Sequence, residues 1–138
     1  MQNDSLVFIN QGCDNRSIWA DVAICGTQLT VSPEAAECLL ERYPTLASHV
    51  CKTKLFGDHL PGALLPHALE HLTIDLLVAA RPGEIFAGNT HWLERKEQTM
   101  RVHISLPKEG GFTLVNEALS EALLQLNEIL AENSRQID

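Results

Sequence analysis

Two histidines and a glutamate in one short stretch of the chain have the types and spacing of a metal-dependent catalytic site. His67, Glu70 and His71 form the pattern His-x-x-Glu-His within residues 62–80, which we predict to be one helix. Residues four apart on a helix lie one turn apart on the same side, so both imidazoles can reach one ion at the ~2.0–2.1 Å zinc–nitrogen distance. This is the residue order of the inverzincins, in which the histidines hold zinc and the glutamate is the general base.

The same motif has a simpler interpretation as part of a polar helix face. Patterns with three fixed positions arise by chance in many proteins, and His67, Glu70 and His71 would then be ordinary polar-face residues. The phase of the helix favours the metal, because at 100° per residue the motif projects away from a leucine stripe, toward solvent or a cleft. That stripe consists of Leu65, Leu69, Leu72 and Leu76.

A catalytic zinc ion needs a third protein ligand, which the motif does not supply. By analogy with inverzincins, which take a carboxylate from a later helix, Glu117 is the first candidate and His91 the second. Both have ordinary alternatives: Glu117 as a solvated helix acid and His91 as a loop histidine. His49 and Cys51 are interpreted as a buried packing pair.

Strand and helix signals alternate along the rest of the chain. Period-two alternation predicts strands at residues 17–25 and 100–106, and Ser32 followed by Pro33 is typical of a helix start. Weaker signals predict a hairpin return at residues 29–31, a short strand at 84–87, a turn at 88–91 and a final helix at 113–132. We predict an α/β (α+β) fold over residues 1–138, a single-domain two-layer sandwich whose helices pack on a mixed sheet, with residues 133–138 as a frayed tail.

Composition narrows the classes of function. The net charge is -8, with 18 acidic and 10 basic residues, which argues against nucleic acid or an anionic membrane as a partner. No apolar run is long enough to span a membrane, and the polar N-terminus lacks the basic start of a signal peptide, so we expect a cytoplasmic protein. None of the four cysteines forms a C-x-x-C pair, and we expect reduced thiols. The oligomeric state is left open.

From about residue 17 to about residue 130, the chain resembles the N-terminal domain of cyanophycin synthetases. The resemblance lies in a Pro-x-Leu, His-x-Cys and Gly-x-x-x-His-x-x-Glu-His-x-x-x-x-Leu progression, and in a later turn, strand and helix. These features are Pro44-Thr45-Leu46, His49-Val50-Cys51, Phe56, Gly62-Ala63-Leu64, His67 to Leu76, Phe86-Ala87-Gly88-Asn89-Thr90, Arg101-Val102-His103-Ile104 and Glu117-Ala118. The chain departs from the family at Ser105, where the family has an acid, and at His91-Trp92, where it usually has a basic residue.

The resemblance implies one of two functions. In some family members this domain is a zinc-dependent hydrolase that cuts a β-aspartyl-arginine polymer, and in others it serves only as a docking surface. His67 and His71 match the metal positions and Glu70 the catalytic acid/base. We therefore expect a zinc-dependent hydrolase of peptide or isopeptide bonds that acts on a peptide or peptide-like polymer. The alternative is a non-catalytic module that binds a peptide or a protein.

Overall fold

Four antiparallel strands form the main sheet of the protein. The computed structural model describes residues 4–51, 54–106 and 111–134. The strands are β1 (Leu6–Cys13), β2 (Ser17–Ile24), β5 (Gly88–Glu94) and β6 (Thr99–Ser105), in the spatial order β1-β2-β6-β5. Two hairpins, β1–β2 and β5–β6, are joined at the centre by β2 and β6, which pair Ser17 with Ser105. Among the described strands every pairing is antiparallel, whereas the sequence predicts a mixed sheet.

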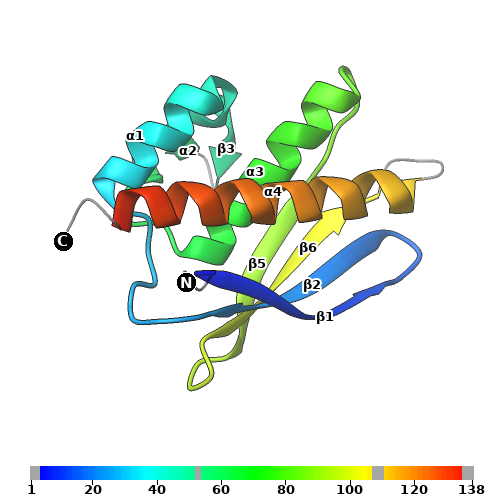
Figure 1. The fold of residues 1–138 in the computed structure, drawn as a ribbon. Helices are drawn as coiled ribbons and strands as arrows, with labels where there is room; N and C mark the ends of the chain where they lie inside the picture. The colour runs from blue at the N-terminus through cyan, green and yellow to red at the C-terminus, as the bar shows by residue number, and fades with distance from the viewer. Residues whose placement is uncertain (1–3, 52–53, 107–110, 135–138) are drawn as a thin grey trace.

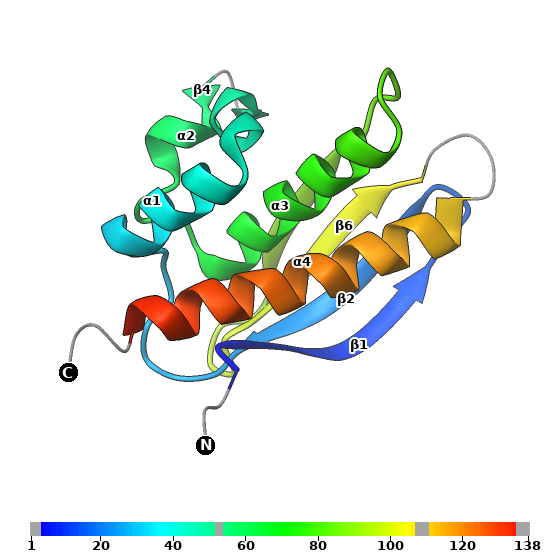
Figure 2. The same cartoon turned by 45° about the horizontal axis from the view of Figure 1, so that its top comes forward.

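The helices cover one face of this sheet, which gives two layers (Figures 1 and 2). α3 and α4 lie across the sheet, while α1, α2, the 3-10 helix η1 and a small β3–β4 hairpin gather beside α3. Their bounds are α1 (Pro33–Arg42), η1 (Pro44–Ser48), β3 (Val50–Cys51), β4 (Lys54–Leu55), α2 (Phe56–His59), α3 (Leu65–Ala80) and α4 (Gly111–Ser134). This arrangement confirms the predicted α/β fold class and places the predicted motif on α3.

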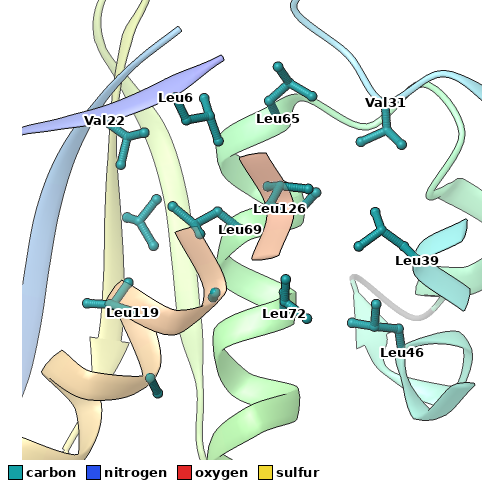
Figure 3. Close-up of a cluster of buried hydrophobic side chains, with 14 of the residues drawn as sticks. Leu6, Val22, Val31, Leu39, Leu46, Leu65, Leu69, Leu72, Leu119 and Leu126 are labelled. Atoms are coloured by element: carbon teal, nitrogen blue, oxygen red, sulfur yellow. The ribbon is translucent and has the colours of Figure 1, made fainter. Parts of the chain in front are cut away.

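The hydrophobic core lies between the sheet and the helices and continues past α3 toward α1 and η1. Figure 3 shows the leucines of α3 between the sheet side chains Leu6 and Val22 and the side chains Leu39 and Leu46. All four of these residues are at most 1% exposed. Apolar burial of this kind is worth about 25 cal/mol per Å², and it holds α3 on two of its sides.

Local sequence signals explain two of the best-predicted elements. In β2 the alternate residues on one face point into the core, and they are Ile18, Ala20, Val22 and Ile24. α1 begins where predicted, because Pro33 occupies the first turn and the Ser32 hydroxyl accepts a hydrogen bond from the backbone N–H of Ala35 at 3.1 Å.

Three weaker predictions were wrong. Residues 29–31 do not return alongside β2, because Val31 exchanges backbone hydrogen bonds with Gly62 and Ala63, just before α3. Residues 84–87 form no strand, and residues 88–91 are the start of β5 rather than a turn. Gly88 and Asn89 suggested a turn from their types alone, but the pairing of β5 with β6 overrides that preference.

The prediction that the motif side of α3 faces solvent or a cleft was also wrong in part. His67 is partly exposed, but Glu70 is 4% exposed and His71 is 5% exposed. α3 is covered on this side too, because η1 and β5 both pack against it. The helix therefore carries polar groups into the interior, and each of these groups needs a partner there.

The end of the chain is helical for longer than predicted. Asn133 and Ser134, which we assigned to the frayed tail, belong to α4, and residues 135–138 lie outside the described part of the chain. Within the described residues, none of the helices combines the length and apolar character needed to cross a membrane.

Candidate metal centre

Three side chains from two separate segments form a possible metal-binding group. His67 and His71 come from successive turns of α3, and Cys51 comes from β3 in the hairpin beside it. One potential ligand atom from each residue lies within 4.8 Å of the other two. The helix spacing brings the two histidines together, and the β3–β4 hairpin adds the thiol.

The chemistry of these donors and the spacing of the Cys51–His67 pair fit a tetrahedral zinc ion. The Sγ atom of Cys51 lies 3.5 Å from Nε2 of His67. Zinc–sulfur and zinc–nitrogen bonds of about 2.3 and 2.05 Å at a tetrahedral angle would separate the two donor atoms by about 3.6 Å. A thiolate and imidazoles are ligands that suit zinc among the common metal ions. Three protein ligands are also the number found in catalytic zinc sites, where the fourth position is left to water or substrate.

His71 is held between two neighbouring rings, Phe56 and His49. Its ring stacks on Phe56 at a centroid distance of 3.8 Å and an interplanar angle of 15°. Its Nδ1 atom lies 3.1 Å from Nδ1 of His49. Burial, together with the nearby charges of His67 and His49, lowers the pKa of His71 to about 3. The ring is therefore neutral at ordinary pH, which is the form that can donate a lone pair to a metal.

Glu70 lies on the other side of the same group, against the sheet. The Thr90 hydroxyl on β5 donates a hydrogen bond to its Oε1 atom at 2.7 Å. Its Oε2 atom lies 4.0 Å from Nε2 of His71. Burial raises the pKa of Glu70, while the Thr90 hydrogen bond and the charge of His49 act in the opposite direction. One carboxylate oxygen is thus held by the sheet, and the other lies near His71.

Gly88 on β5 makes room for the Glu70 carboxylate. A Cβ atom at this position would lie 3.1 Å from Cγ and 3.2 Å from Oε2 of Glu70, and 2.6 Å from the carbonyl oxygen of His103. The strand can pass this close to the motif only without a side chain here. This close approach, rather than a turn, accounts for the glycine.

The structure brings together three of the residues predicted for the site and leaves two elsewhere. His67, Glu70 and His71 are adjacent, as their spacing predicts. Glu117 is exposed on α4 and is not part of the donor group. His91 is exposed on β5, where its ring stacks on His103 at 5.4 Å. Since Thr90 points to Glu70 and successive residues of a strand face opposite ways, His91 points to the other side of the sheet.

Cys51 is the residue that sequence reasoning missed. The sequence pairs it with His49 as a packing residue, and the third-ligand candidates from sequence are Glu117 and His91. Two features could have drawn attention to it. It lies 16 residues before His67, and a thiol is a common zinc ligand. Its approach to α3 depends on a hairpin of two-residue strands, which has no periodic sequence signal.

Comparisons of the chain with family models, with curated proteins and with solved structures found no match. The resemblance to the N-terminal domain of cyanophycin synthetases stays a prediction.

Proposed function

We propose that this protein is a zinc-dependent hydrolase of peptide or isopeptide bonds. In this proposal Cys51, His67 and His71 hold zinc, and Glu70 is the general base. The observation that carries the proposal is the position of Glu70, whose Oε2 atom lies 4.0 Å from Nε2 of a candidate ligand, beside a donor group with three members. A buried carboxylate next to an incomplete metal coordination sphere is the arrangement that hydrolytic zinc sites use.

Glu70 and Thr90 have distinct roles in this chemistry. Bound zinc would supply Lewis acidity toward a carbonyl oxygen and toward water. Glu70 would accept a proton from the attacking water at Oε2 and deliver it to the leaving nitrogen. Thr90 would keep Oε1 occupied by its hydrogen bond, so that Oε2 stays aimed at the reacting groups. The contact with Thr90 also limits rotation of the carboxylate, which favours a single reactive orientation.

The expected substrate class comes from the resemblance to cyanophycin synthetases. That family supports a peptide-like polymer with β-aspartyl linkages as the substrate, with short peptides as the broader class. Ser105 and His91-Trp92 differ from the family pattern, so substrates should be surveyed from ordinary peptides to isopeptides.

A second candidate function is a binding module that does no chemistry. It is favoured by the burial of the reactive groups, because Glu70 and His71 are only 4% and 5% exposed. Large apolar side chains are exposed on the neighbouring hairpin, where Val50 is 70% exposed and Leu55 is 50% exposed. In this alternative the metal group would stabilise the hairpin, and the hairpin would contact a peptide or a protein.

Glu70→Gln separates hydrolysis from metal binding. The substitution preserves the shape of the side chain and removes its basic oxygen, so zinc content should stay near that of the wild type. Cleavage of a peptide or β-aspartyl substrate should fall by roughly 10²–10⁴, the usual worth of a positioned acid/base group. Glu37→Gln, which changes an exposed acid on α1, is the matched control and should keep full activity. A Glu70→Gln protein with full activity would contradict the proposed mechanism.

Elemental analysis tests the ligands themselves. Cys51→Ala should lose zinc, as should His67→Ala and His71→Ala. Glu117→Gln and His91→Asn remove the two competing candidates and should retain it. Zinc loss in either of these two variants would restore that residue as the third ligand, and a wild type that never carries metal would favour the binding module.

A further inference from the structure

Three polar residues outside the donor group form a hydrogen-bonded chain that ends on His71. The Thr45 hydroxyl donates to Oδ1 of Asp75 at 2.5 Å. Nε2 of His49 lies 3.1 Å from the same Oδ1 atom, and Nδ1 of His49 lies 3.1 Å from Nδ1 of His71. The side chain of His49 is 14% exposed and that of Asp75 is 8% exposed. These contacts come from η1, from the residue that follows it and from α3, so the chain is built by tertiary packing.

The direction of each hydrogen bond follows from the chemistry of the groups. An ionised carboxylate can only accept hydrogen bonds, so the proton between Asp75 and His49 is on Nε2 of His49. A neutral imidazole with its proton on Nε2 has a lone pair on Nδ1. When His49 is neutral, the proton between the two facing Nδ1 atoms therefore belongs to His71, which donates it to His49. The remaining nitrogen of His71, Nε2, then carries its lone pair.

We infer that Thr45, Asp75 and His49 are positioning residues that fix His71 as the tautomer able to bind metal through Nε2. This inference rests on the proposed function only in taking the metal site as its starting point. Nε2 of His71 is the ring nitrogen that lies near Oε2 of Glu70, so the lone pair is on the side where the chemistry is proposed. Phe56 stacks on the ring of His71 and limits its tilt. The hydrogen-bonded chain of Thr45, Asp75 and His49 determines which ring nitrogen carries the lone pair. Partners of this kind orient ligands and raise their basicity in metal sites generally.

The tautomers can be measured directly in the metal-free protein. Long-range proton–nitrogen NMR correlations at neutral pH distinguish an imidazole protonated on Nδ1 from one protonated on Nε2. We expect His49 as the Nε2–H form and His71 as the Nδ1–H form. His71 protonated on Nε2 would overturn the inference. This measurement requires neither bound zinc nor activity.

Measurements of zinc affinity test whether the hydrogen-bonded chain strengthens metal binding by His71. His49→Phe keeps a flat ring but removes the acceptor for His71, and zinc affinity should fall by about 10–100-fold. His49→Asn can return an amide oxygen near the former Nδ1 position and should restore most of that loss. Asp58→Asn removes an exposed acid from the neighbouring α2 and should leave affinity unchanged.

The outcomes separate this inference from the proposed function. Equal zinc affinity in the wild type, His49→Phe and His49→Asn would overturn the positioning role. Competition with a chromogenic chelator reports zinc affinity without any substrate. A loss of zinc affinity in His49→Phe that is restored in His49→Asn therefore supports the inference, even if the protein hydrolyses no substrate. Absence of hydrolysis in a zinc-loaded wild type contradicts only the proposed function.

Discussion

Gly88 shows how closely one residue of the sheet is fitted to the candidate site. Gly88→Ala would place a methyl group 2.6 Å from the carbonyl oxygen of His103, which is backbone and cannot simply rotate away. We expect a loss of about 1–3 kcal/mol in the free energy of unfolding, as for other overpacked positions. Urea denaturation would measure it. Asn89→Ala, at an exposed neighbour, should change stability by less than about 0.5 kcal/mol, and an unaltered midpoint for Gly88→Ala would contradict the close approach.

His71 should make the stability of the metal-free protein depend on pH. Its pKa is about 3 in the folded chain and close to 6.5 when unfolded, so the unfolded state binds more protons between these values. Stability is therefore fully present above about pH 6.5 and is lost as the pH falls toward 3. The slope should approach, at most, about 1.4 kcal/mol per pH unit.

Urea denaturation in the presence of a chelator, repeated from pH 7 to pH 5, would measure this slope. His71→Asn should flatten it, whereas His59→Asn, at an exposed histidine of α2, should leave it unchanged. The raised pKa of Glu70 contributes with the opposite sign, so the difference between wild type and His71→Asn isolates the histidine. Identical profiles for these two proteins would show that His71 is not responsible.

α3 is the element on which both the core and the site depend. Leu69 and Leu77 are fully buried, whereas Leu76 is only partly buried. Leu69→Ala and Leu77→Ala should each cost roughly 2–5 kcal/mol of unfolding free energy, the usual range for buried leucine truncations. Leu76→Ala should cost clearly less, and thermal or urea denaturation would compare the three. A loss below about 0.5 kcal/mol for Leu69→Ala would place that side of the helix outside the core.

The same helix shows what its sequence could and could not predict. Leucine periodicity predicts Leu65, Leu69, Leu72 and Leu76 as core residues; the structure confirms the first three, whereas Leu76 is only partly buried. The periodicity also suggested an open opposite side, but η1 and β5 cover it. Burial of Glu70 depends on those distant segments, so a pattern within α3 could not reveal it.

The spacing of residues along α3 likewise predicts only part of the candidate site. The two histidines of the motif are adjacent because a helix turn makes them so. Cys51 and Thr90 reach the site from a two-residue strand and from the edge of the sheet. Their positions depend on how the β3–β4 and β5–β6 hairpins pack beside α3, which a pattern within α3 does not encode.

For the whole molecule, metal binding should be coupled to stability. A ligand that binds only the folded state stabilises it by RT ln(1 + [L]/Kd), about 2.7 kcal/mol when free zinc is 100 times Kd. We expect differential scanning calorimetry to show a melting temperature that rises with zinc and falls after chelation. Cys51→Ala should respond much less, because it lacks one of the three donors. Cys25→Ala, at an exposed cysteine outside the group, should respond like the wild type, and a melting temperature insensitive to zinc in the wild type would contradict the site.

The central pairing of the sheet has a consequence for the order in which the protein forms during synthesis. β2 lies beside β6, so Ala23 pairs with Thr99 and Ser17 with Ser105. The β1–β2 hairpin leaves the ribosome long before its partner strand exists, with one edge of β2 unpaired. Such an edge is a template for pairing with another unfinished chain. Newly made chains are therefore most prone to aggregate before β6 emerges, and Thr90 can reach Glu70 only after Cys51, His67 and His71 have all been synthesised.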